Sequence, residues 1–153
     1  MSYLLDTSIL VRLANGSDPL HPMAVAALTA LFREDEPLDV APQNLIEFWS
    51  VCTRPLEANG GLGLTVEDAR SIADVLAAEF LIASDTPEIY PALRQILEAV
   101  PVVGKQVHDA RLAAVCHVHG IQTVVTFNVR HFARFSHLSP GLRVVEPQQI
   151  VEA

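Results

Sequence analysis

Residues 3–14 read Tyr3-Leu4-Leu5-Asp6-Thr7-Ser8-Ile9-Leu10-Val11-Arg12-Leu13-Ala14. The apolar run before Asp6 suits a short buried strand, and the apolar residues after it recur with helical spacing. A strand that passes through a polar turn directly into a helix is typical of parallel sheets covered by helices. The stretch therefore predicts an α/β fold whose first strand ends at a carboxylate.

The rest of the chain repeats this alternation of strands and helices. Strands are predicted over residues 38–41, 122–126 and 142–145, and residues 80–83 fit either a short strand or a helix end. Helices are predicted over residues 21–33, 44–52, 65–79 and 87–100, and a further helix runs from residue 108 to about Gly120. We expect a three-layer α/β/α arrangement, with a central and mostly parallel sheet flanked by helices.

The composition fits a single domain spanning residues 1–153. Half of the residues are hydrophobic, which is enough to bury a core without disulfides or a structural metal. Cys52 and Cys116 lie in apolar segments without zinc-site spacing, so we expect buried, reduced thiols. No segment approaches the roughly 18 apolar residues of a membrane span, and the N-terminus lacks a signal-peptide pattern. A soluble, cytoplasmic protein is expected.

The charge distribution bears on possible partners. A formal net charge of -8 argues against nucleic-acid binding by the surface as a whole. Residues 104–143, however, contain five of the ten lysines and arginines, five of the six histidines, and only one of the 18 acids, Asp109. The C-terminal third is therefore locally cationic, either as a nucleic-acid-binding face or as a chance shift in composition.

Polar residues occur where the predicted strands end, at the sheet edge that binds ligands in parallel sheets. Asp6 directly follows the first strand, Glu47 lies about one turn after the second, Asp109 begins a helix, and Asn128 follows the strand ending at Thr126. Carboxylates brought together repel one another unless a cation neutralises them. All-oxygen ligands favour Mg²⁺ or Mn²⁺ over zinc, so we expect a divalent-cation site formed by Asp6, Glu47 and Asp109.

Each of these residues also has a structural interpretation. Asp6 and Asp109 can act as helix N-caps, and Asn128 can stabilise the turn after its strand. Glu47 is flanked by bulky apolar residues, where a carboxylate is costly unless paired, and Arg54 two turns onward is an alternative partner. The same choice between a site role and a local structural role applies to Ser8, Thr126 and His131.

Four short segments stand out along the chain. They are Leu4-Leu5-Asp6-Thr7-Ser8, Asn44-Leu45-Ile46-Glu47-Phe48, His108-Asp109-Ala110-Arg111-Leu112-Ala113-Ala114 and Val125-Thr126-Phe127-Asn128-Val129-Arg130-His131-Phe132. Each is a weak signal alone. In this order and spacing, over the whole chain, they resemble the four signature segments of the PIN-domain family, and in particular the VapC-type toxins of bacterial toxin–antitoxin pairs.

The resemblance implies acidic metal ligands at Asp6, Glu47 and Asp109, with Asn128 at a fourth position that is acidic in some members and asparagine in others. It also implies a metal-dependent endoribonuclease, often a homodimer, that is silenced by an antitoxin whose C-terminal segment lies across the active-site groove. Many members carry an aspartate where this chain has His131. If that position helps bind a second metal, the ion would be held more weakly here.

The expected reaction is RNA hydrolysis in which a metal-activated water attacks phosphorus in line and leaves a 5′-phosphate and a 3′-hydroxyl. Arg111, Arg130 and Arg134 are candidates for guiding the RNA backbone. A small-molecule phosphohydrolase with Asp6 as nucleophile is an alternative, but it would usually carry a second aspartate where Ser8 stands. A non-catalytic PIN-like binding module is the other alternative, and it would be expected to lack one of the three acids.

Overall fold

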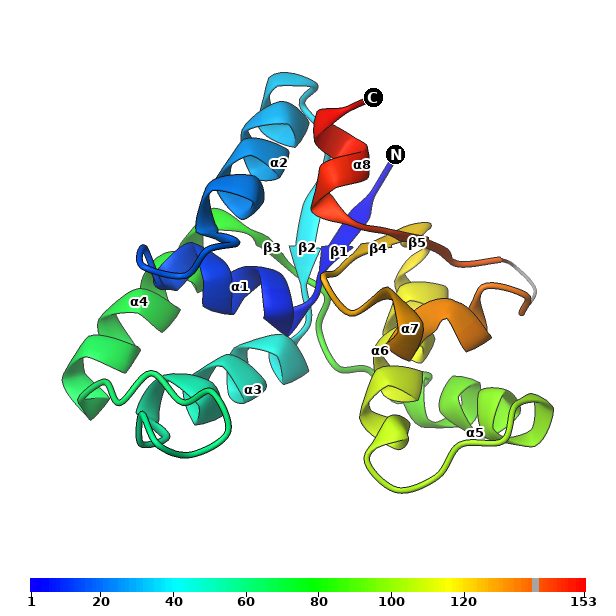
Figure 1. Ribbon diagram of the computed structural model, residues 1–153. Coiled ribbons are helices and arrows are strands. Elements are labelled where there is room, and N and C mark those ends of the chain that lie inside the picture. The colour runs from blue at the N-terminus through cyan, green and yellow to red at the C-terminus, as the bar shows by residue number, and fades with distance from the viewer. Residues whose placement is uncertain (139–140) are drawn as a thin grey trace.

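A parallel sheet organises the chain (Figure 1). The computed structural model describes residues 1–138 and 141–153, and within them five strands form one all-parallel sheet in the order β3-β2-β1-β4-β5. The strands are β1 (Tyr3–Leu5), β2 (Leu38–Val40), β3 (Leu81–Ile82), β4 (Thr123–Val125) and β5 (Arg143–Val145). The three strands predicted after the first agree within one residue at each end, and the ambiguous segment at residues 80–83 contains the edge strand β3.

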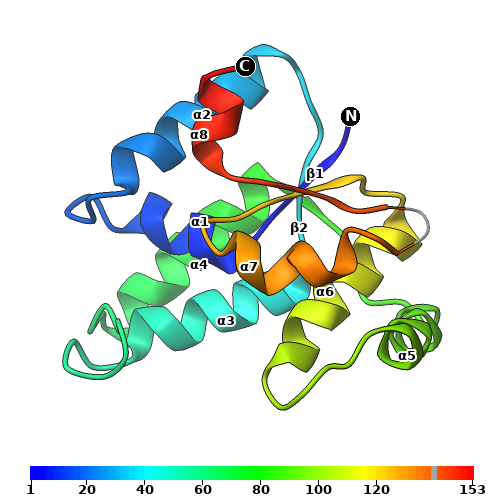
Figure 2. The same ribbon diagram turned by 45° about the vertical axis from the view of Figure 1, so that its right-hand side comes forward.

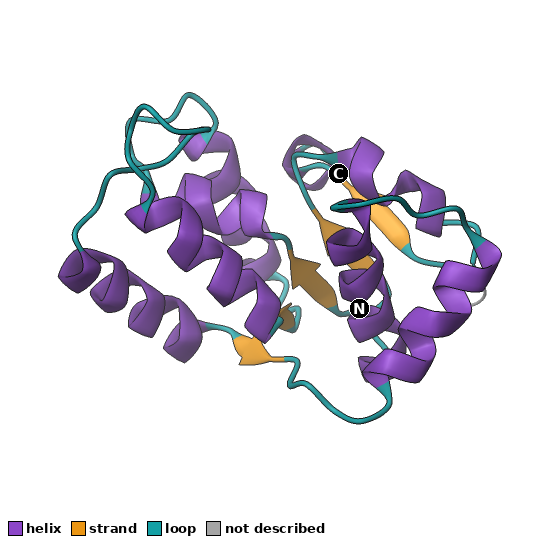
Figure 3. Ribbon diagram, turned by 90° about the horizontal axis from the view of Figure 1, so that it is seen from below, coloured by secondary structure: helices purple, strands orange, loops and turns teal. Residues whose placement is uncertain are grey.

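Helices cover both faces of the sheet (Figures 1 and 3). One face packs against α5 (Ile89–Ala99), α6 (Gln106–His119), α7 (Val129–Phe132) and the 3-10 helix η1 (Ala133–Phe135). The other packs against α1 (Thr7–Ala14), α2 (His21–Arg33), α3 (Pro42–Thr53), α4 (Val66–Glu79) and α8 (Pro147–Val151). Leu4 and Val124 join the first core, whereas their neighbours Leu5 and Val125 join the second, as the alternation of side chains along a strand requires. The predicted three-layer α/β/α arrangement is confirmed.

Local capping explains where two helices begin. The helix predicted from Asn44 starts at Pro42 instead, because the Asn44 side-chain oxygen accepts the Ala41 backbone N–H at 2.8 Å and proline suits a first helical position. Thr65 caps α4 as predicted, with its hydroxyl oxygen accepting the Asp68 N–H at 3.1 Å. Asn44 therefore fixes the first turn of α3, and Thr65 fixes the first turn of α4.

The start of α6 was predicted wrongly. The helix begins at Gln106, two residues before His108, so Asp109 lies inside the first turn and is not the N-cap. Gly104 adopts a left-handed φ of 58°, which glycine tolerates, and the Gln106 side-chain oxygen accepts the Val103 N–H at 3.0 Å. Capping by Asp109 is therefore excluded, and its carboxylate is available for another role.

Strand register brings distant residues together. Leu5 on β1 lies opposite Val125 on β4, so the residues that follow the two strands, Asp6 and Thr126, become neighbours at the sheet edge. The Asp6 backbone N–H donates to the Val125 carbonyl at 3.0 Å and extends this pairing past the end of β1. The first polar residues after β1 and β4, Asp6 and Thr126, therefore lie side by side at the carboxyl edge of the sheet.

Both cysteines lie in the core of the protein. Cys52 and Cys116 are buried and unpaired, and burial raises the pKa of their thiols to about 11 and about 12. The predicted buried, reduced thiols are therefore found. Within residues 1–138 and 141–153 there is no helix with both the length and the apolar character needed to cross a membrane.

Candidate active site

A groove of about 600 Å³ runs along the carboxyl ends of the central strands, and we call it the acidic groove. Asp6, Glu47, Asp109 and Asn128 all line it, so the four residues singled out from the sequence are brought together. They come from the turn after β1, from α3, from α6 and from the turn after β4. The loop at residues 59–62 forms another part of its wall.

Two hydroxyl groups hold the carboxylate of Asp6. Its Oδ2 accepts hydrogen bonds from the Ser8 hydroxyl at 2.8 Å and from the Thr126 hydroxyl at 2.7 Å. The backbone N–H groups of Phe127 and Asn128 donate to those same two hydroxyl oxygens at 3.1 and 2.9 Å, which fixes the direction in which each hydroxyl points. Asp6 occupies the N-cap position of α1 but makes no capping bond with its side chain. The arrangement favours the site role of Asp6, Ser8 and Thr126 over helix capping.

Glu47 projects from the second turn of α3, and its Oε1 accepts a hydrogen bond of 2.7 Å from the Gln43 side-chain amide. Burial raises the pKa of Glu47, the Gln43 hydrogen bond partly offsets this, and the negative charge of Asp6 raises the pKa further. Arg54 does not pair with Glu47, because its guanidinium donates instead to the Asn59 carbonyl at 3.1 Å and to a serine hydroxyl. The alternative of a local ion pair is therefore excluded.

The carboxyl of Asp109 combines burial with nearby negative charge. Burial raises the pKa of its carboxyl to about 6, and the charges of Asp6 and Glu47 add to that effect. The His131 ring lies 3.6 Å from Asp109 Oδ2 and, when protonated, lowers the same pKa. The groove thus holds carboxylates whose ionised forms oppose one another, and a bound positive charge would relieve that conflict.

The donor set suits a hard divalent cation, since every candidate ligand is a carboxylate or amide oxygen. Among the residues described, no three acidic, histidine or cysteine side chains stand close enough together to enclose one ion. Asp6 and Glu47 each keep one carboxylate oxygen without a hydrogen bond from the described part of the chain. These free oxygens of Asp6 and Glu47, together with the Asp109 carboxylate, are the groups that would bind a cation.

Comparisons with known proteins identify the family. The family model described as PIN domain matches residues 3–138, which is most of the chain. The chain belongs to the PIN domain family. No curated protein matches the sequence.

Solved structures share the fold of this PIN domain at low sequence identity. VapBC2 from Rickettsia felis has a TM-score of 0.66 and 21% identity, with coverage of 95% of this chain and 98% of that chain. VapBC-1 from nontypeable Haemophilus influenzae has a TM-score of 0.65 and 15% identity, covering 97% and 99%. VapC20 from Mycobacterium tuberculosis, described as a sarcin-ricin loop cleaving toxin, has a TM-score of 0.61 and 20% identity, covering 86% and 93%. The expected resemblance to the PIN family is confirmed.

The three arginines suggested as RNA contacts have different surroundings in this PIN domain. Arg111 donates to the Gln43 side-chain oxygen at 3.1 Å and forms an ion pair with Asp85 at 2.7 Å, and it does not line the acidic groove. Arg134 lies above the Phe135 ring at 6.0 Å, and its charge lowers the pKa of Asp109. Arg130 lines a neighbouring cavity next to His131. Their RNA contacts remain predictions, and Arg111 is the one whose guanidinium is already engaged.

Sequence reasoning missed Arg12, which lines the acidic groove. Its guanidinium donates to the Ser8 carbonyl at 3.3 Å, sits 5.5 Å above the centre of the Phe127 ring, and approaches Asp18 at 3.6 Å. Its buried Nε atom has no hydrogen-bond partner among the residues described. The sequence could have indicated Arg12, because it follows Ser8 by four residues and therefore lies on the same side of α1.

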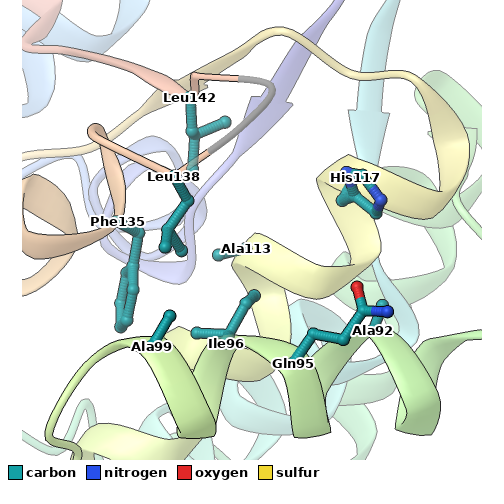
Figure 4. Close-up of a pocket in the computed structure, with 9 residues that line it drawn as sticks. All are labelled: Ala92, Gln95, Ile96, Ala99, Ala113, His117, Phe135, Leu138 and Leu142. Atoms are coloured by element: carbon teal, nitrogen blue, oxygen red, sulfur yellow. The ribbon is translucent and has the colours of Figure 1, made fainter.

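A second, apolar cavity of about 240 Å³ lies between α5 and α6 (Figure 4). Ile96, Phe135 and Leu138 contribute apolar walls, and among the residues described His117 is the only titratable one that lines it. Its described lining has no carboxylate that could hold a cation beside a phosphate. The acidic groove is therefore the site whose chemistry suits the reaction expected from the sequence.

Proposed function

We propose that this PIN domain is a divalent-cation-dependent endoribonuclease and the toxin component of a type II toxin–antitoxin pair. The observation that carries the proposal is the convergence of Asp6, Glu47 and Asp109 on one groove large enough for a nucleotide chain. Burial and, after it, the charges of Asp6 and Glu47 raise the pKa of Asp109, and a bound cation would offset both effects. The description of VapC20 as a toxin that cleaves the sarcin-ricin loop supports RNA as the substrate class.

In the proposed reaction, Asp6, Glu47 and Asp109 would hold Mg²⁺ or Mn²⁺, directly or through waters. The chemistry that such a cation supplies is polarisation of the phosphoryl group and a lower pKa for bound water. Ser8 and Thr126 keep the Asp6 carboxylate facing one way, and the Asn128 amide orients a water in the groove. Attack of water on phosphorus breaks the bond to the 3′-oxygen, which gives a 5′-phosphate and a 3′-hydroxyl without use of the ribose 2′-hydroxyl.

The proposed partners follow from charge and from the family. We infer that Arg12, Arg130 and Arg134 contact the RNA backbone. Arg12 lines the acidic groove, Arg130 lines the cavity beside it, and the charge of Arg134 acts on Asp109, which supports this inference. A net charge of -8 and an acidic groove suit an antitoxin segment that carries basic side chains. A homodimer and a cytoplasmic location are part of the same proposal.

The test is cleavage of total RNA by the wild-type protein and by Asp6→Asn, each with Mg²⁺, Mn²⁺ or EDTA. Asparagine keeps an oxygen that can accept from Ser8 and Thr126, so the variant should fold. We expect discrete cuts bearing 5′-phosphates that require a cation and disappear in Asp6→Asn. Asp74→Asn, an exposed position on α4, should cleave like the wild type.

Two other outcomes would redirect the assignment. RNA left intact under every condition would favour a non-catalytic binding module. Hydrolysis of small phosphate esters through a covalent phosphate on Asp6 would favour a small-molecule phosphohydrolase, although the groove's volume of about 600 Å³ and the two hydroxyls bonded to Asp6 Oδ2 do not suggest it.

A further inference from the structure

One side-chain amide connects the two helices that carry acids of the groove. Gln43 lies one helical turn before Glu47 on α3 and is 9% exposed. Its nitrogen donates to Glu47 Oε1 at 2.7 Å and to the backbone carbonyl of His108 at 2.8 Å. His108 immediately precedes Asp109 on α6. One hydrogen of this amide nitrogen therefore orients Glu47 within α3, and the other ties α3 to the neighbouring helix α6 (Figures 1 and 2).

Arg111 determines which way this amide points. The Gln43 oxygen accepts from Arg111 Nη1 at 3.1 Å, and Arg111 Nη2 donates to Asp85 Oδ1 at 2.7 Å. If the amide were reversed, its N–H₂ group would face the guanidinium, and its oxygen would face the Glu47 carboxylate and a backbone carbonyl. All three hydrogen bonds of the amide would be lost. The ion pair between Arg111 and Asp85 thus makes Gln43 present its donor end to Glu47.

We propose that Asp85, Arg111 and Gln43 form a positioning relay that holds Glu47 in the orientation needed to bind a divalent cation. The relay occupies Oε1 of Glu47 and directs Oε2 to the groove. Hydrogen bonds to a ligating carboxylate commonly orient it in this way. The inference rests on the proposed function of the groove, and it gives Arg111 a role that acts through Gln43 and not through contact with RNA.

Calorimetric titration of Mn²⁺ into the whole protein, without RNA, tests the relay apart from turnover. Gln43→Ala should weaken Mn²⁺ binding by about 10- to 100-fold, the usual cost of losing a partner of a metal ligand. Arg111→Gln should weaken it by a smaller factor, and Arg111→Lys should restore part of the loss. The double variant should bind no more weakly than Gln43→Ala alone, because Arg111 acts only through that amide.

RNA cleavage kinetics supply a second readout. Loss of the relay should lower kcat and leave KM unchanged, since no substrate contact is removed. Arg94→Gln is the matched control, because Arg94 is an exposed arginine on α5 whose partner is Glu98. It should change neither Mn²⁺ affinity nor kcat. If Gln43→Ala does not fold, Gln43→Met retains the chain length without the amide and carries the same expectations.

The outcomes separate the relay from the proposed function. Unchanged Mn²⁺ affinity in Gln43→Ala, in a protein whose wild type binds Mn²⁺, overturns the relay. Additive losses in the double variant, with a raised KM for Arg111→Gln, also overturn it and assign Arg111 to the RNA. A wild-type protein that neither binds Mn²⁺ nor cleaves RNA overturns the proposed function together with the relay.

Discussion

Replacing Asp109 with asparagine should make the cation-free protein more stable. The pKa of Asp109 is raised from its ordinary 3.8 to about 6, first by burial and then by the charge of Asp6. The folded protein therefore holds this proton more tightly than the unfolded chain does. The protonated carboxyl contributes stability that is fully present below pH 3.8 and is lost as the pH rises through about 6.

The size of the effect follows from the shift. A rise from 3.8 to about 6 is about two pKa units, or about 3 kcal/mol at 1.36 kcal/mol per unit. The Asp109 side chain is 25% exposed, so solvent screens part of this energy and we expect about 1–2 kcal/mol. Asparagine is similar in size and carries no charge, so Asp109→Asn should recover this amount at pH 7.5.

Urea denaturation in EDTA between pH 4 and pH 8 measures the effect. The free energy of unfolding of the wild type should fall by about 1–2 kcal/mol between pH 4 and pH 6 relative to Asp109→Asn. Asp74→Asn, exposed on α4, should follow the wild type at every pH. If Asp109→Asn were no more stable than the wild type at pH 7.5 and kept the same pH slope, the raised pKa of Asp109 in the folded protein would be refuted.

Two other substitutions test the surroundings of Asp6. Thr126→Val removes the hydroxyl that donates to Asp6 at 2.7 Å and leaves the Asn128 N–H unpaired, so urea denaturation should show a loss of about 1–3 kcal/mol. An unchanged free energy of unfolding would contradict this bond. Arg12→Gln, in an Asp6→Asn background that prevents cleavage, should weaken RNA binding and reduce the slope of log affinity against log salt by about 0.7. Fluorescence anisotropy measures that slope, and an unaltered value would place Arg12 outside the RNA path.

The sequence was sufficient to predict the fold because its local signals agree with one another. Short apolar runs ending at polar residues marked the central strands, and the helices between them carried regular apolar spacing. Placement of Asp6, Glu47, Asp109 and Asn128 on one groove followed from a general property of parallel sheets, whose carboxyl ends share an edge. Short elements such as α7 and α8 were not predicted, because five residues or fewer carry too little periodicity.

Side-chain partners could not be predicted, because they depend on contacts between segments far apart in the chain. The amide of Gln43 reaches the His108 carbonyl 65 residues away, and nothing near Gln43 in the sequence indicates this. The hydroxyl of Thr126 reaches Asp6 only because β1 and β4 are adjacent and in register. The sequence alone left both a capping role and a site role open for Asp6 and Thr126, and the pairing of β1 with β4 shows that their side chains bond to each other.

Arg111 shows why a count of charges along the sequence misjudges a binding surface. Its charge helped to define a cationic C-terminal third, yet it is paired with Asp85, 26 residues earlier, and its other nitrogen is bonded to Gln43. A guanidinium engaged on both sides would have to break those bonds before it could hold a phosphate. Arg12, by contrast, lines the groove itself, and its Nε faces Asp18 Oδ2 at 3.6 Å without a hydrogen bond among the described residues. The positive charge that meets RNA should therefore come from both ends of the chain, and the salt dependence of Arg12→Gln measures the part contributed by the first helix.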